Sequence, residues 1–391
     1  MGIMKNVSIV IGANFGDEGK GVITDALCSK NKSLVVLSNG GPQRAHTVFD
    51  PITKKPHIFK HFCSGTFRNC GTYFPRSFIV NPMEFVRELN ELEENSSFNR
   101  HNIICYRSTG CCFTTPFDMI LNQELENWRS RNDFKYGTCG MGIWETVLRY
   151  SIWSKNLTVE EFSSLNHERK LHYLESIKNY CSIRYNSITG KEFIYPDYVN
   201  DEMCEHFIRD FNTFCDVCML DINQDVLNNS DNIVFENGQG LLLDVDYIGS
   251  MYNNYATPSS TGLLNPVDIM SKFRNKIHNL NIYYVTRPYI TRHGPTKILE
   301  HIFKGWEKHT SENEINHDND LQGSFVKTAI HQELQDHVIR MDLSFLSKIR
   351  PDHVNVKMAY THLDEESPMK TGSFSIVECG NKFGIDVSGL Y

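Results

Sequence analysis

Residues 7–21 of this 391-residue chain read VSIVIGANFGDEGKG, and residues 39–47 read NGGPQRAHT. The first stretch is an apolar run that predicts a buried strand, followed by a glycine-rich loop that opens a helix. Such a loop aims several backbone N–H groups, and the positive end of the helix dipole, at one point in space. That point suits a phosphate, and Lys20 adds a positive charge there. Asp17 and Glu18 place carboxylates where a phosphate clamp alone would not need them, so they indicate chemistry.

The loop does not meet the general P-loop pattern. That pattern needs a glycine where Asn14 stands and a serine or threonine, to hold magnesium, where Gly21 stands. A P-loop kinase or a GTPase switch is therefore disfavoured.

Gly16 to Gly21 match, without change, the signature of the adenylosuccinate synthetases, in which a strand is followed by QWGDEGKG and then by a GHT loop. Asn14 and Phe15 replace the Gln and Trp, and Ala45 replaces the glycine before the histidine. The chain thus resembles this family, and the likeness continues in order along most of its length. The further segments that resemble family motifs are Ser64-Gly65, 115–118 (TPFD), 137–143 (GTCGMGI), 236–246 (ENGQGLLLDVD), 255–262 (YATPSSTG), 284–287 with 291–295, and 361–364 (THLD).

The alternation of apolar runs with amphipathic stretches predicts an α/β fold with a central, mostly parallel sheet flanked by helices. We expect a single domain over residues 1–391, with a helical subdomain at about 151–220 that contains Phe207, Phe211 and Phe214 at helical spacing. The candidate strands are Val7–Ile11, Leu34–Leu37, Asn102–Tyr106, Asn232–Glu236, Ile282–Val285 and Val354–Ala359.

Composition indicates a soluble enzyme. The formal net charge is −8, which argues against a nucleic-acid or anionic-membrane footprint. The N-terminus does not read as a signal peptide, and no apolar run approaches the roughly 18 residues of a membrane span, so we expect a cytoplasmic protein. Its 12 cysteines then read as reduced thiols. Cys215 and Cys218 have the spacing of half a zinc site, but helix-packed cysteines are the favoured interpretation.

The resemblance implies the chemistry. Replacing a purine 6-oxygen by an amine requires removal of the N1 proton and phosphorylation of O6. The resemblance implies that Asp17 is the base, that His46 is the acid facing the transferred phosphoryl group, and that Gln239 contacts the purine nucleotide and supports the base. It also implies Mg²⁺, held by Asp17 and Ala45.

Nucleotide binding is implied for a larger set. Lys20 and the glycine amides would hold the triphosphate, and Thr257 with Thr138 or Cys139 would hold the nucleotide phosphate. Arg149 stands near the arginine that family members insert into a neighbouring subunit, although a surface arginine is an equal alternative. The full set is Gly16, Glu18, Gly19, Lys20, Gly21, Thr47, Thr138, Cys139, Arg149, Thr257, His362 and Asp364.

Two departures concern the substrates. Where the family recognises aspartate with an arginine-rich run, this chain has DLQGSFVK at 320–327, which resembles the phage 2-aminoadenylosuccinate synthetases that join aspartate to dGMP. The candidates for aspartate binding are then Arg292, Gln322, Gly323 and Lys327, with Arg287 as a further cation. Residues 361–364 (THLD) resemble the TKLD motif with which the family recognises guanine. His362 replaces the lysine of that motif while Asp364 remains, so GTP, ATP and dATP are all candidate phosphoryl donors.

The sequence therefore predicts a homodimeric ligase that joins L-aspartate to a purine monophosphate. IMP is the leading acceptor, because Asp17 is retained, and dGMP is the alternative. A nucleotide sensor or phosphohydrolase that lost ligase activity is the competing class, favoured by the missing arginines. The retention of both Asp17 and His46 favours catalysis, because a binding module needs neither a base nor an acid.

Overall fold

The computed structural model describes residues 4–132, 137–244, 247, 257, 259–273, 277–293, 322–326, 329–349, 351–363, 374–379 and 382. Their centre is a nine-stranded sheet with the order β15-β14-β11-β1-β10-β2-β5-β7-β9. Neighbouring strands run parallel except β15, which is antiparallel to β14. The strands are β1 (Lys5–Gly12), β2 (Leu34–Leu37), β5 (Gly71–Phe74), β7 (Cys105–Ser108), β9 (Cys218–Asp221), β10 (Asn232–Glu236), β11 (Ile277–Thr286), β14 (His353–Thr361) and β15 (Phe374–Glu378).

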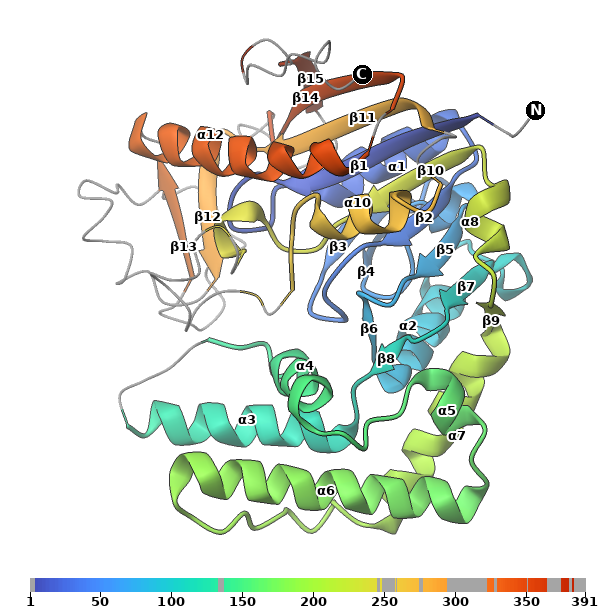
Figure 1. Cartoon of the computed structure of the whole chain (residues 1–391), viewed down its shortest axis with the longest axis vertical. Helices are drawn as coiled ribbons and strands as arrows, with labels where there is room; N and C mark the ends of the chain where they lie inside the picture. Colours follow the sequence, from blue (N-terminus) through green and yellow to red (C-terminus); the bar gives the residue numbers. More distant parts are fainter. Residues whose placement is uncertain are drawn as a thin grey trace.

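Helices cover both faces of this sheet, as an α/β fold requires (Figure 1). The α-helices of the described residues are α1 (Lys20–Lys30), α2 (Pro82–Asn95), α3 (Pro116–Ser130), α4 (Ile143–Ile152), α5 (Val159–Ser163), α6 (His167–Thr189), α7 (Asp201–Val217), α8 (Asp225–Asn229), α10 (Leu264–Met270) and α12 (Ala329–Leu343). Short two-stranded pairs stand outside the main sheet: β3 (His46–Phe49) with β4 (Pro56–Phe59), β6 (Ile79–Val80) with β8 (Cys112–Phe113), and β12 (Tyr289–His293) with β13 (Gln322–Val326).

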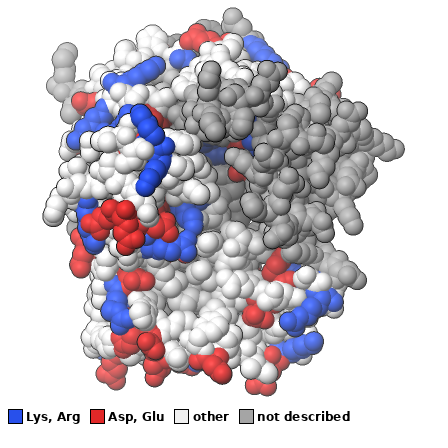
Figure 2. All heavy atoms as spheres, turned by 180° about the vertical axis from the view of Figure 1, so that it is seen from behind, with Lys and Arg blue, Asp and Glu red and all other residues white. Residues whose placement is uncertain are grey.

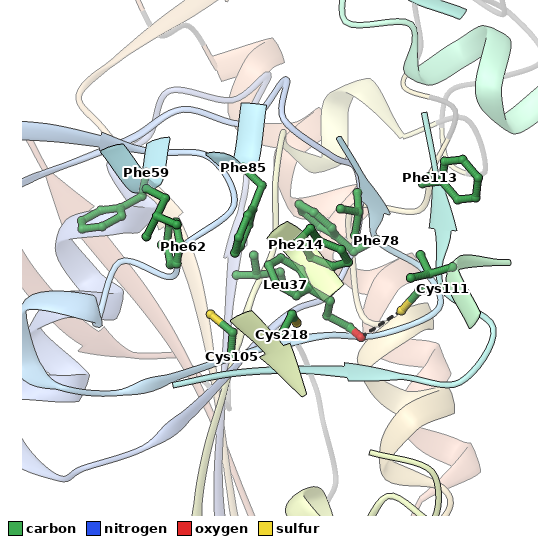
Figure 3. Close-up of a cluster of buried hydrophobic side chains, with 14 of the residues drawn as sticks. Leu37, Phe59, Phe62, Phe78, Phe85, Cys105, Cys111, Phe113, Phe214 and Cys218 are labelled. Carbon is green, nitrogen blue, oxygen red and sulfur yellow. Dashed lines mark hydrogen bonds between the residues drawn. The ribbon is translucent and has the colours of Figure 1, made fainter. Parts of the chain in front are cut away.

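The alternation of side chains along the strands divides the core into two layers. On β1, Ile9 and Ile11 point toward the layer under α10 and α12, whereas Val10 points toward the layer under α1, α2 and α7. Figure 3 shows part of the second layer, where Phe85 of α2 and Phe214 of α7 lie over the strands, with ring centroids 5.0 Å apart. Burying each such ring contributes about 1.5–3 kcal/mol, so this layer binds the helices firmly to the sheet.

Most predicted strands are confirmed. Leu34–Leu37 and Asn232–Glu236 agree residue for residue, and three others lie inside longer strands. The prediction of Asn102–Tyr106 is wrong at its start, because Asn99 caps a short helical turn at Arg100–Asn102 and β7 begins only at Cys105. β5, β9 and β15 are not among the predicted strands. β9 follows α7 with no turn residue between them, since Cys218 both ends the helix and begins the strand.

The helical region lies between β8 and β9 and begins earlier than predicted, at Pro116 rather than at about residue 151. Thr115 and Asp118 form a capping box around Pro116, which starts α3. Phe207, Phe211 and Phe214 are buried on α7, as the helical spacing predicted. In Figure 1, α3, α4 and α6 gather below the sheet.

Cys215 lies on α7 and Cys218 on β9, so the prediction that helices hold both cysteines is wrong for the second. No group of three or more His, Cys, Asp or Glu side chains in the described part of the chain is placed to hold a metal ion. Lys and Arg are interspersed with Asp and Glu on the face shown in Figure 2. No helix among the described residues is long and apolar enough to cross a membrane.

Candidate active site

Three loops meet at the carboxyl ends of β1, β10 and β2, which are neighbours in the sheet. Parallel strands place these ends at one edge, the usual ligand-binding edge of open α/β sheets. A Cβ added to Gly16, in the first loop, would lie 3.8 Å from the Cα of Gln239 in the second. In the third loop, Asn39 accepts from the Gly238 N–H at 2.8 Å, and its amide Nδ2 lies 3.4 Å from Gln239 Oε1. The structure therefore brings the predicted segments together.

Glu18 holds the first loop in shape. Its Oε1 accepts from the backbone N–H groups of Asn14 and Gly16, both at 2.9 Å, and its Oε2 accepts from Lys20 Nζ at 2.8 Å. Glu18 is fully buried, and Lys20 is 3% exposed. Glu18 is thus an internal brace of the loop, and it orients the Lys20 ammonium.

Three predicted site residues have left-handed backbone conformations. The φ angles are 60° at Asp17, 55° at Gln239 and 54° at His362. Such values are uncommon for residues other than glycine, and such strain tends to collect at functional sites. Asp17 is exposed, as a residue that must reach a ligand should be.

His46, which follows the loop after β2, lies in a buried network that joins it to Glu236 at the end of β10. Its Nδ1 is 2.5 Å from Glu236 Oε1 and 2.9 Å from Arg44 Nη2. Arg44 Nη2 is itself 2.7 Å from the same Glu236 oxygen, and Glu236 also accepts from the Ser64 hydroxyl and, at 3.1 Å, from the Ser64 N–H. A side chain at Gly21 would crowd this group, since its Cβ would lie 3.0 Å from that of His46.

Burial lowers the pKa of His46 to about 4, and the nearby Arg44 charge lowers it as well, against the opposing pull of Glu236. Burial alone would raise the pKa of Glu236, but Arg44 and His46 hold it well below its usual range. At neutral pH, Arg44 and Glu236 therefore form the ion pair, and the low pKa of His46 favours its neutral form.

We expect a pH dependence of stability from this histidine. An unfolded His46 takes up a proton at about pH 6.5, whereas the folded one does so only near pH 4, so the unfolded state binds more protons between these values. The free energy of unfolding should therefore fall by about 3 kcal/mol as the pH drops through this window. His46→Gln should remove that slope in urea titrations, whereas the exposed-residue variant His101→Gln should keep it. A stability difference between wild type and His46→Gln that does not change with pH would contradict the assignment.

Ser64 is positioned by a second buried carboxylate. Glu88 of α2 accepts from three consecutive backbone N–H groups, those of Lys60, His61 and Phe62, at 2.9, 2.6 and 3.3 Å. Burial would raise the pKa of Glu88, but these hydrogen bonds and the neighbouring His57 and His61 keep it at about 2. The chain that leads to Ser64 is thus fixed before it meets Glu236.

The described residues between β10 and α10 (237–244, 247, 257 and 259–263), here the β10–α10 segment, include Gln239 and Thr257. The Thr257 N–H donates to the Leu243 carbonyl at 2.9 Å, and the Asp244 carboxylate accepts from the Thr261 N–H at 2.6 Å. The Thr257 hydroxyl is buried, in a residue 8% exposed, and has no hydrogen-bond partner among the residues that the structure describes. A buried polar group in that state is one that a ligand can satisfy.

His362 lies against the first loop. The Thr361 hydroxyl is 2.5 Å from the Glu18 carbonyl and 2.9 Å from His362 Nδ1, and a Cβ at Gly19 would touch Thr361. The predicted base-recognition motif therefore reaches the nucleotide loop, although Asp364 lies outside the described residues.

Thr138 and Cys139 lie in the loop before α4, whose first residue, Ile143, sits against Gly41 of the third loop. Thr138 Oγ1 lies 2.8 Å from Asn122 Oδ1, and Cys139 is exposed. On the β3 hairpin, Thr47 is exposed beside His46.

Arg149 departs from its predicted role. Its guanidinium is fully buried and donates to both Asp118 oxygens, at 2.8 and 2.9 Å, and to Asn156 Oδ1 at 2.6 Å. This geometry ties α4 to α3 within one subunit. The prediction of a surface or projecting arginine is therefore wrong here, because Asp118 holds the Arg149 guanidinium inside the helical region of its own chain.

The predicted aspartate-binding residues are only partly described. Arg292 and Gly323 are register partners in the β12–β13 pair, where Gln322 is opposite His293. The side chains of Arg292 and Gln322, and all of Lys327, lie outside the described part of the chain. Arg287, which follows β11, is buried.

The residues assigned to Mg²⁺ fit that ion in their chemistry. Asp17 offers a carboxylate and Ala45 a backbone carbonyl, both are exposed, and hard oxygen donors are what Mg²⁺ prefers. Mg²⁺ is usually held by one or two protein oxygens together with phosphate oxygens and water rather than by an all-protein cage.

Arg44, Asn39, Ser64 and Glu236 have no role in the site predicted from the sequence, although all four stand in the motifs that carry the family resemblance. The available signal was charge: Arg44 is a cation two residues before His46, and Glu236 ends a buried strand. Only the fold shows that these two residues pair.

The comparisons with known proteins agree with this geometry. A sequence model described as adenylosuccinate synthetase matches residues 9–318. The adenylosuccinate synthetase of Acaryochloris marina is 30% identical over 261 residues, which cover 66% of this chain and 55% of that protein. That of Lactobacillus helveticus is 26% identical over 298 residues, 75% of this chain and 65% of that protein. The chain thus spans less than two thirds of the length of these relatives.

Two solved structures share the fold. The fully ligated adenylosuccinate synthetase from Plasmodium falciparum aligns with a TM-score of 0.65 at 18% identity, over 96% of this chain and 87% of that chain. The succinoaminodeoxyadenylate synthetase of cyanophage S-2L, bound to dGMP and dATP, aligns with a TM-score of 0.53 at 12% identity, over 90% and 92%. Since the family model covers most of the sequence, the chain belongs to the adenylosuccinate synthetase family, a family of ligases.

Proposed function

We propose that this chain is a C–N bond-forming ligase that joins L-aspartate to IMP, with cleavage of GTP or ATP through a 6-phosphoryl intermediate. The observation that carries the proposal is the meeting of three elements at one sheet edge: the exposed Asp17, the Gln239 loop, and His46 paired with Glu236. A base, an amide and an acid in one place are the groups that the two-step reaction needs.

In the first step, Asp17 accepts the N1 proton of IMP, and O6 attacks the γ-phosphorus while the nucleoside diphosphate leaves. In the second, the aspartate amine attacks C6 and inorganic phosphate departs with the former O6. Gln239 supports the purine through an amide that can both donate and accept. Each step moves negative charge onto oxygens, which a hydrogen-bond donor at the right place stabilises.

His46 acts as that donor only after substrate binds. A triphosphate brings negative charge next to a neutral imidazole, and a nearby opposite charge raises the pKa of a histidine. Glu236, already within 2.5 Å of Nδ1, then stabilises the imidazolium. The acid is thus formed together with the complex.

Binding is shared among the other predicted residues. The loop amides around Gly16, Gly19 and Gly21, together with Lys20, hold the triphosphate. The Thr257 hydroxyl, buried without a partner, donates to the phosphate of the acceptor nucleotide. Mg²⁺ held by Asp17 and the Ala45 carbonyl would neutralise charge on the transferred phosphate.

A second candidate is a dGMP-dependent synthetase. The Gln322-Gly323 segment and His362 favour it, as does the shared fold with the cyanophage enzyme bound to dGMP and dATP. The missing arginine run also keeps open a sensor or phosphohydrolase without ligase activity.

A chromatographic assay separates these functions. Protein, Mg²⁺ and aspartate are combined with IMP, dIMP, GMP or dGMP, and with GTP, ATP or dATP as donor. We expect a succinyl adduct, detected by mass spectrometry, with IMP in preference to dGMP in direct competition. Phosphate release that is equally fast without aspartate, and no adduct, would replace the ligase with a phosphohydrolase.

Sedimentation with both nucleotides tests the homodimer that family resemblance suggests, and a monomer alone would reject it.

A further inference from the structure

A buried carboxylate lies behind the β10–α10 segment. Asp342, near the end of α12, is fully buried. Its Oδ1 accepts from the Tyr247 hydroxyl at 2.5 Å and from the Leu263 N–H at 2.7 Å, and its Oδ2 accepts from the Tyr284 hydroxyl at 2.8 Å. Tyr284 lies on β11, whereas Tyr247 and Leu263 belong to the β10–α10 segment. One carboxylate therefore joins the segment to the central sheet.

The fit around Asp342 is close. A Cβ at Gly262 would overlap the carboxylate, so the segment approaches α12 as nearly as its backbone allows. Burial raises the pKa of Asp342 to about 6, but the carboxylate is still ionised at neutral pH and can accept from all three donors. Hydrogen bonds to a charged acceptor are about twice as strong as those between neutral groups, so this is a firm anchor.

Hydrogen bonds inside the segment connect Leu263 to both candidate ligand-binding residues. Asn237 Nδ2, two residues before Gln239, donates to the carbonyls of Thr261 and Gly262 at 2.7 and 2.8 Å. The Thr261 N–H donates to the carboxylate of Asp244, and the carbonyl of the adjacent Leu243 accepts from the Thr257 N–H at 2.9 Å. A shift at Leu263 would thus reach Gln239 through Asn237, and Thr257 through Asp244 and Leu243.

We propose that Asp342 is a positioning residue of the acceptor-nucleotide site, which holds the β10–α10 segment against α12 so that Gln239 and Thr257 meet the purine monophosphate. This inference rests on the proposed function for the identity of the ligand. Asp342, a residue of α12 that belongs to none of the family motifs, would thus control the binding of the acceptor.

The test uses the full chain with Asp342→Ala and Tyr247→Phe, and Tyr284→Phe as the matched control. Alanine removes the acceptor of all three hydrogen bonds, and Tyr247→Phe removes only the segment's own hydroxyl. We expect both to raise KM for IMP about tenfold, with KM for the triphosphate within about twofold and kcat little changed. Tyr284→Phe removes the sheet-side bond alone and should lower Tm while leaving KM for IMP within about twofold.

Hydrogen exchange provides a readout that needs no turnover. In Asp342→Ala, backbone amides of the β10–α10 segment should exchange faster, while those of β1 and β10 stay protected. Equal weakening of both nucleotides, or exchange that rises over the whole sheet, would make Asp342 a general stability residue and overturn the proposal. If wild type makes no succinyl adduct, the proposed function fails separately, and the exchange data still decide whether Asp342 positions the segment.

Discussion

Asp17→Asn is expected to lower kcat about a hundredfold to ten-thousandfold, the usual worth of a general base, with the fold intact. Asparagine keeps the size of the side chain but cannot take the N1 proton. Asp17 is exposed at the edge of the glycine loop, and the buried Glu18 braces that loop through the N–H groups of Asn14 and Gly16, so stability should hardly change. His46→Ala should show a loss of similar size, because it removes the acid from the same step.

The measurement is steady-state turnover of the substrates that the assay identifies. A second measurement, made without aspartate, follows the exchange of oxygens between the bridging and non-bridging positions of the triphosphate. This exchange reports the first step alone. Asp17→Asn should abolish both. Asp231→Asn, at an exposed aspartate ahead of β10, serves as the control and should keep both. Near-normal turnover in Asp17→Asn or His46→Ala would refute the assigned mechanism.

Glu236→Gln should destabilise the protein by about 3–5 kcal/mol as well as abolish turnover. The substitution leaves the Arg44 guanidinium fully buried with no counter-charge, and removing one partner of a buried ion pair has this effect. Within the described part of the chain, Arg44 Nε and Nη1 have no hydrogen-bond partner, so the ion pair with Glu236 is the main compensation of Arg44. Glutamine keeps one acceptor oxygen for His46 and the Ser64 hydroxyl, but its amide nitrogen cannot accept from the Ser64 N–H.

Urea unfolding measures this loss, and the double variant Arg44→Met with Glu236→Gln distinguishes its cause. Replacing both charges removes the uncompensated cation, and such replacements are often close to neutral. We expect the double variant to recover most of the stability while remaining inactive. If it is as unstable as Glu236→Gln alone, the loss comes from packing or from Ser64 rather than from Arg44.

The sequence by itself determined the local pieces of this protein. Short apolar runs ending in glycine loops predicted β1, β2 and β10, because a strand buried on both faces must be apolar throughout and a turn of unusual φ favours glycine. The loop of residues 12–21 and its neighbour at 39–47 could be located in the same way, since their meaning lies in consecutive residues. Asp17 and His46 were identified as candidates before any fold was known.

Only the tertiary structure decided how these pieces act on one another. His46 and Glu236 are 190 residues apart in the chain, and they meet because β2 and β10 are neighbours in the sheet. The same packing places Arg44 beside them and makes His46 neutral, and it pairs Arg149 with Asp118, where sequence suggested a projecting side chain. Asp342 stands on a helix with no recognisable motif, 79 residues after Leu263. Burial and charge depend on which distant groups come within a few ångströms, and that is a property of the whole fold rather than of any stretch of chain.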